Sequence, residues 1–111
     1  MATVTLRNHG NLSVEAISTG DTWSGDSWKY ARNRLYAEGV MFDKALIDRF
    51  AGLVLIGADM TVHFEHAVCG YDGTGPQTTA KILCLFGFGS YESIMETIKT
   101  GGDEAAFVFY R

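Results

Sequence analysis

The segment from Gly70 to Thr79 holds the residue types that could most directly bind a ligand. It reads Gly-Tyr-Asp-Gly-Thr-Gly-Pro-Gln-Thr-Thr and falls between an expected strand and an expected helix. Glycines let the backbone approach a ligand closely, and the free amides at a helix start attract a phosphate or a carboxylate. The residues predicted to contact a small anion here are Gly73, Thr74, Gly75, Gln77 and Thr78.

The spacing of Gly70 and Gly75 is similar to the start of a phosphate-binding P-loop, but the similarity ends there. Pro76 and Gln77 stand where that motif needs Lys and then Ser or Thr, and the Lys is the residue that reaches the outer phosphates. The sequence therefore indicates no nucleotide hydrolysis. A tight loop that only caps a helix is the plainer interpretation of the same glycines.

Residues 22–34 place aromatic and basic side chains together. Flat rings beside guanidinium groups suit a base with an attached phosphate. The residues predicted to bind the ligand here are Trp23, Lys29, Arg32 and Arg34. Trp28 recurs with Ala31 and Leu35 at helical spacing, so we expect it in the core instead.

His63 and Glu65 are expected on one face of a strand, where such a pair could do acid–base work. No obvious nucleophile lies near them in the sequence. His63 and His66 differ in parity and so point to opposite faces, and Cys69 adds only one further ligand, which does not make a zinc site. We expect no enzyme activity, no cofactor and no metal site. A small enzyme that uses His63 and Glu65 stays open as a third interpretation.

The hydrophobic pattern predicts the elements that must position these residues. Alternation or apolar runs predict strands over residues 2–7, 12–17, 53–57, 61–66 and 105–110, the first two as a hairpin. Helical spacing predicts helices over residues 28–38, 42–50, 76–86 and 90–100, ended by glycines. Together they predict an α+β domain of two layers, with a five-stranded antiparallel or mixed sheet and helices on one face.

The same layout of hairpin, glycine loop, helix, glycine and helix occurs twice, in about residues 2–52 and 51–102. The glycine loops 18–27 and 67–76 match in length. Because few residues are identical, a ββαα pseudo-repeat and a chance recurrence of a common packing arrangement both stay open. The two loops could meet within one chain or across an interface.

The composition of the chain limits the kinds of partner that it can bind. The 111 residues, 47% of them hydrophobic, fit a single domain over residues 1–111. The net charge of −4 is a poor match for extended nucleic acid, which needs many cations. No apolar run is long enough for a membrane span, and no secretory signal is visible. We therefore expect a small protein of the cytoplasm that does not bind membranes.

These observations favour a non-enzymatic protein that holds or sequesters a small anionic, nucleotide-like ligand, as some small phage-encoded counter-defence proteins do. The strongly β-forming end of the chain, Phe107 to Tyr110, favours a homo-oligomer. The alternative is an acidic inhibitor or adaptor that binds a protein target through its charge. The residues that would carry that alternative are Asp21, Asp26, Asp43, Asp103 and Glu104.

Overall fold

The computed structural model describes residues 3–9, 12–18, 25–58, 60–65 and 67–111, with residues 3–9, 12–18 and 25–27 described as backbone only. The strands are β1 (Thr3–His9), β2 (Leu12–Ser18), β3 (Lys44–Asp48), β4 (Gly52–Ile56), β5 (Met60–Phe64) and β6 (Ala106–Tyr110). The helices are α1 (Gly25–Tyr30), which continues as a π-helical segment η1 (Ala31–Tyr36), then α2 (Thr74–Leu85), α3 (Tyr91–Ile98) and a short 3-10 turn η2 (Gly102–Glu104).

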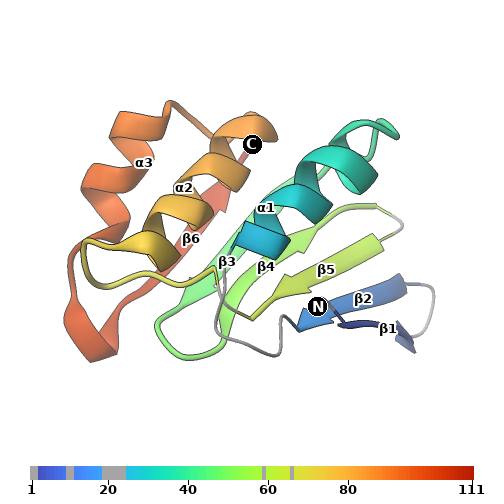
Figure 1. Cartoon of the computed structure of the whole chain (residues 1–111), viewed down its shortest axis with the longest axis horizontal. Coiled ribbons are helices and arrows are strands. Elements are labelled where there is room, and N and C mark those ends of the chain that lie inside the picture. The colour runs from blue at the N-terminus through green and yellow to red at the C-terminus, as the bar shows by residue number, and fades with distance from the viewer. Residues whose placement is uncertain (1–2, 10–11, 19–24, 59, 66) are drawn as a thin grey trace.

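The strands form one mixed sheet in the order β1-β2-β5-β4-β3-β6. Every neighbouring pair is antiparallel except β2 with β5, which run parallel. Helices α1, α2 and α3 lie side by side on one face of the sheet, with α2 between the other two (Figure 1). The predicted α+β class is confirmed. No helix within the described ranges is long and apolar enough to cross a membrane.

The helix predicted over residues 42–50 is wrong, because this segment contains strand β3. Burial alternates along the strand, with Ala45 and Ile47 facing the helices, which is the period of a strand. The Asp48 carboxylate accepts hydrogen bonds from the amides of Phe50 at 2.8 Å and Ala51 at 3.1 Å. This tight turn returns the chain into β4, so the described sheet has six strands where the sequence predicts five.

The repeat predicted for the two halves loses one correspondence through this correction. β3 of the first half stands where the second half has helix α3. Most of the first glycine loop, residues 19–24, lies outside the described residues, so its match to the second loop stays a prediction.

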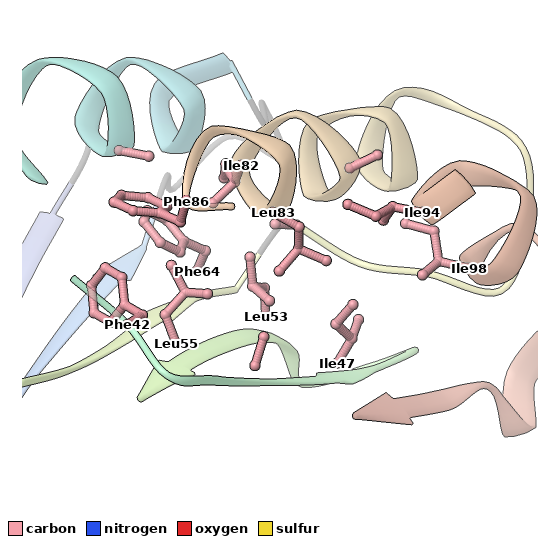
Figure 2. Close-up of a cluster of buried hydrophobic side chains, with 14 of the residues drawn as sticks. Phe42, Ile47, Leu53, Leu55, Phe64, Ile82, Leu83, Phe86, Ile94 and Ile98 are labelled. Carbon is pink, nitrogen blue, oxygen red and sulfur yellow. The ribbon is translucent and has the colours of Figure 1, made fainter. Parts of the chain in front are cut away.

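The two layers meet through a continuous set of buried apolar side chains (Figure 2). Leu53 and Leu55 of the sheet pack under α2 and α3. The rings of Phe42 and Phe86 meet edge to face, with centroids 4.9 Å apart. Removing one such buried side chain typically costs about 2–5 kcal/mol. The helix layer is therefore firmly anchored, and the outer surface of its helices is a fixed scaffold.

Two helix ends follow local rules visible in the sequence. The Ser90 hydroxyl accepts a hydrogen bond from the Ser93 amide at 3.2 Å, so it is the N-cap of α3 as predicted. At the end of η1, Gly39 adopts φ +77°, and the Val40 amide donates to the Leu35 carbonyl at 3.0 Å. A left-handed glycine of this kind is the usual way to close a helix.

Candidate ligand-binding site

The glycine loop before α2 is packed into the fold. The Gly70 amide donates to the Ile98 carbonyl at 2.6 Å, and the Gly70 carbonyl accepts from the Gly102 amide at 3.0 Å. A Cβ atom at Gly73 would lie 2.6 Å from Cε2 of Tyr71. These glycines therefore allow close packing against α3 and against the Tyr71 ring.

The predicted anion-binding residues of this loop divide between two sides of α2. Gly75 and Thr78 are buried, while Thr74 and Gln77 are exposed. The spacing of three and four residues continues this side of α2 through the exposed Lys81 and Cys84 and the half-buried Leu85. Thr74 and Gln77 therefore share the outer face of α2 with these residues, and Gly75 and Thr78 lie on its inner side.

The predicted basic residues of the first helix are exposed and differ in their partners. Arg34 pairs with Glu38 at 3.9 Å. The Arg32 guanidinium lies 5.8 Å from the centroid of the Trp28 ring, and its Nε donates to Asn33 Oδ1 at 3.2 Å. Neither Arg32 nor Lys29 has an acidic partner within the part of the chain that the structure describes. Trp23, the fourth predicted residue of this segment, lies outside the described residues.

A groove of about 450 Å³ crosses the outer surface of the helix layer. Trp28 of α1 and Tyr91 of α3 flank it, and α2 forms its floor. The residues that line it are Trp28, Lys81, Cys84, Leu85 and Tyr91. Its size falls within the range of small-molecule sites, which are mostly apolar with few polar groups.

The groove combines rings, hydrocarbon and positive charge. Trp28 is half-buried: it packs on the core, as the sequence predicts, and it also lines the groove. Lys81 is exposed at the groove. The Arg32 guanidinium lies 5.8 Å from the centroid of the Trp28 ring, and Arg32 is not among the described lining residues. None of the described lining residues is acidic, and no described carboxylate pairs with Lys81. A flat apolar group with a negative charge fits these neighbours best.

Sequence reasoning predicted none of the five groove residues as ligand contacts: Lys81, Cys84, Leu85 and Tyr91 were missed, and Trp28 was expected in the core. Three of the missed residues, Lys81, Cys84 and Leu85, lie on α2. Their signal is the spacing of three and four residues on α2, opposite to the buried stripe of Ile82 and Leu83. This outer stripe resembles an ordinary solvated helix face. Whether this stripe lies next to Trp28 and Tyr91 depends on how the three helices pack. The spacing of residues within one helix gives no information about that packing.

A second hollow, of about 510 Å³, contains His63 and Glu65. Its lining residues are Arg49, Phe50, Ala51, His63, Glu65 and Val68. The His63 Nε2 forms a hydrogen bond with the Ala51 carbonyl, so this ring nitrogen is already engaged. Among the described residues, no Ser, Thr or Cys lines the hollow, and burial raises the pKa of the nearby Cys69 thiol to about 11. The described part of the chain therefore offers no activated nucleophile to the His63–Glu65 pair.

The described acidic residues do not gather into a metal site. No group of three or more His, Cys, Asp and Glu side chains with metal-binding geometry occurs among the described residues. Asp43, Asp103 and Glu104 are exposed, and Asp103 pairs with Arg49 at 3.9 Å. Asp21 and His66 lie outside the described residues, and only the backbone of Asp26 is described.

Comparisons of this chain with family models, with curated proteins and with solved structures give no match.

Proposed function

We propose that this protein binds and sequesters a small nucleotide-like ligand, one flat apolar group joined to an anionic group, in the groove between α1, α2 and α3. The observation that carries the proposal is the meeting of two aromatic side chains, Trp28 and Tyr91, with the ammonium of Lys81 in one apolar groove. None of the described carboxylates pairs with this ammonium.

The groove offers each part of such a ligand a matching contact. A planar group packs on Trp28, Tyr91 and the Leu85 side chain, and stacking of a base on an aromatic side chain contributes about 1–3 kcal/mol. The anionic group meets Lys81 and Arg32. A hydrogen bond to a charged group contributes about 1.5–3 kcal/mol, so charge and stacking are of similar weight.

The outer face of α2 extends the groove toward the start of the helix. Gln77 and Thr74 lie on this face, about one and two turns before Lys81. A longer anionic chain, such as a diphosphate, runs from Lys81 toward these two polar side chains. The proposal therefore retains Thr74 and Gln77 as ligand-binding residues at the start of α2. The buried Gly75 and Thr78 support the helix and make no ligand contact in this proposal.

Binding without turnover is the activity proposed. Among the described residues that line the groove, none carries a carboxylate or an imidazole to act as a general base. The positive charge of Lys81 and the dry aromatic walls bind the ligand and withdraw it from solution.

The test measures the fluorescence of Trp28 in a Trp23→Phe background during titration with AMP and, separately, with adenosine. AMP is expected to change the emission at concentrations where adenosine does not, because only AMP carries the anionic group. Lys81→Glu is expected to weaken AMP binding about tenfold or more. Lys99→Glu is the matched control, since Lys99 is paired with Glu96 at 3.1 Å and lies beyond the far end of α3.

Equal responses to AMP and adenosine would contradict the proposal that the groove binds the anionic group of the ligand. No response in emission or in melting temperature to AMP, ADP-ribose or a cyclic dinucleotide would overturn the proposal as a whole, because a ligand that binds only the folded state must stabilise it. The protein-binding inhibitor or adaptor would then be the better hypothesis.

A further inference from the structure

Strand β6 is an edge of the sheet, and three of its five residues direct their backbone hydrogen-bonding groups away from β3. Among the described strands it pairs only with β3. The Arg49 amide donates to the Ala105 carbonyl and the Arg111 amide donates to the Asp43 carbonyl, each at 3.0 Å. Odd-numbered residues of β6 therefore bond to β3. In an antiparallel ladder the alternate residues, Ala106, Val108 and Tyr110, direct their N–H and C=O groups to the open side.

The edge lacks the features by which proteins usually prevent strand pairing. Charged residues, Pro and bulges are the common devices, and the sequence of β6, Ala-Phe-Val-Phe-Tyr, contains neither a charge nor a proline. The side chains that β6 presents on the sheet face away from the helices are also apolar: Val108 is 51% exposed and Tyr110 is 71% exposed. The strand is thus ready to accept another strand along its whole length.

We propose that β6 pairs with β6 of a second copy of this chain, antiparallel, about a twofold axis at Val108. This register places Val108 opposite Val108 and Ala106 opposite Tyr110, and these are the residues whose amides and carbonyls face outward. All five residues of the strand are then paired. A shift of the axis to another residue leaves residues at the strand ends without partners.

The open face of the sheet is the face that the helices do not cover, and the side chains on it support the same register. A hollow of about 370 Å³ lies there beside Ala106. It exists because small residues follow one another across the sheet, with Ala106 opposite Asp48 and Asp48 opposite Gly52. The proposed pairing sets Tyr110 of the second copy next to Ala106, at the end of this row. The exposed ring then has a hollow to enter, and twofold symmetry repeats the contact.

The remaining cross-strand rows are also complementary to a second copy. The central row of the open face is Val54, Leu46 and Val108, and the twofold axis joins it to the same three residues, which gives one continuous apolar row.

Charges match in the rows on either side. Lys44 lies opposite Tyr110, with its Nζ 5.4 Å from the ring centroid. Across the proposed interface, this row continues from Tyr110 into Ala106 and then Asp48 of the second copy. Each such row therefore has the positive charge of Lys44 in one copy and the negative charge of Asp48 in the other. The Arg111 end of one strand likewise meets the Ala105 end of the other, one residue from Glu104. This pattern favours a second copy of the chain over an unrelated strand.

Native mass spectrometry and light scattering of the purified protein test the proposal. The wild-type chain is expected at twice the chain mass. Val108→Lys and Val108→Glu are each expected at the monomer mass, since the register places the two like charges directly opposite each other. A mixture of these two variants is expected to form a heterodimer. Tyr36→Lys is the matched control: this side chain is 53% exposed in the helix layer, and the dimer is expected to persist.

Three results would overturn the pairing. The first is a wild-type chain that stays monomeric at every concentration at which it is soluble. The second is a dimer that survives in both Val108 variants, which would place the interface elsewhere. The third is failure of two folded, monomeric variants to combine when mixed, which would show that Val108 does not face itself. Circular dichroism establishes that each variant is folded.

Discussion

The guanidinium of Arg49 lies 4.6 Å from the centroid of the Tyr71 ring. This contact joins the turn between β3 and β4 to the glycine loop before α2. Arg49 is 30% exposed and also pairs with Asp103 at 3.9 Å, so it links three segments that are distant in the sequence. Gly73 leaves the space in which the Tyr71 ring lies. The Tyr71 ring therefore packs between Arg49 and Gly73, and these two contacts hold the glycine loop in place.

Gly73→Ala is expected to destabilise the protein by about 1 kcal/mol, the order of one exposed cation–π contact. The backbone at Gly73 is extended, with φ 179°, so the cost comes from the Tyr71 ring and not from the backbone. The new Cβ would lie 2.6 Å from that ring and would push it away from Arg49. Urea unfolding of Gly73→Ala and the wild type measures the difference.

The control for this prediction is the same change in a Tyr71→Ala background. Without the ring, Gly73→Ala is expected to cost nothing or to stabilise slightly, because alanine reduces the freedom of the unfolded chain. An equal cost in both backgrounds would show that the contact between Gly73 and Tyr71 does not set the stability of the loop.

The β3–β4 turn is expected to make stability depend on pH. Hydrogen bonds from the amides of Phe50 and then Ala51 lower the pKa of Asp48 below its ordinary value of 3.8. A carboxylate with a lowered folded-state pKa stabilises the fold above its unfolded pKa, and this contribution is lost as the pH falls through the folded-state pKa. Asp48→Asn is therefore expected to be less stable than the wild type at neutral pH.

The difference between Asp48→Asn and the wild type is expected to shrink as the pH falls below 3.8. Thermal unfolding of both proteins across the acid range measures it. Asp43→Asn is the comparison, since Asp43 is also exposed and precedes the same strand. A constant difference between Asp48→Asn and the wild type at every pH would contradict the role of the Asp48 charge.

Much of the fold is predictable because local patterns and final burial agree. Ser90 precedes a helical stripe and is the cap of α3. The unbroken apolar run over residues 53–56 is a central strand. The segment over residues 42–50 is different, because Phe42, Ala45 and Phe50 fit both a helical stripe and a strand followed by a turn. Two features favour the strand: the turn at Asp48 and the pairing of β3 with β4 and β6, which the local sequence does not reveal.

The candidate groove is less predictable than the fold. Lys29 and Arg32 were predicted from the local mixture of basic and aromatic residues, and both are exposed near Trp28. Lys81 and Tyr91 join Trp28 only because three helices pack side by side. A tertiary site of this kind leaves no pattern within any one segment, whereas the glycines of the loop are conspicuous in the sequence and serve its packing.

Cys84 offers a chemical test of the groove, since the two cysteines should differ sharply in reactivity. Cys84 is exposed in the groove. Burial, and secondarily the charge of Asp48, raise the pKa of Cys69 to about 11, which leaves about one molecule in a thousand as thiolate at about pH 8. Iodoacetamide is therefore expected to modify the wild type quickly at one site and to leave Cys84→Ser unmodified over the same period.

A ligand in the groove must then shield this thiol. Saturating AMP is expected to slow the alkylation of Cys84, and adenosine at the same concentration is expected to have little effect, because it lacks the group that Lys81 binds. Mass spectrometry of the intact protein follows the reaction. If AMP changes the Trp28 emission but leaves the alkylation rate unchanged, the ligand does not cover Cys84, and the groove between α1, α2 and α3 is not its binding site.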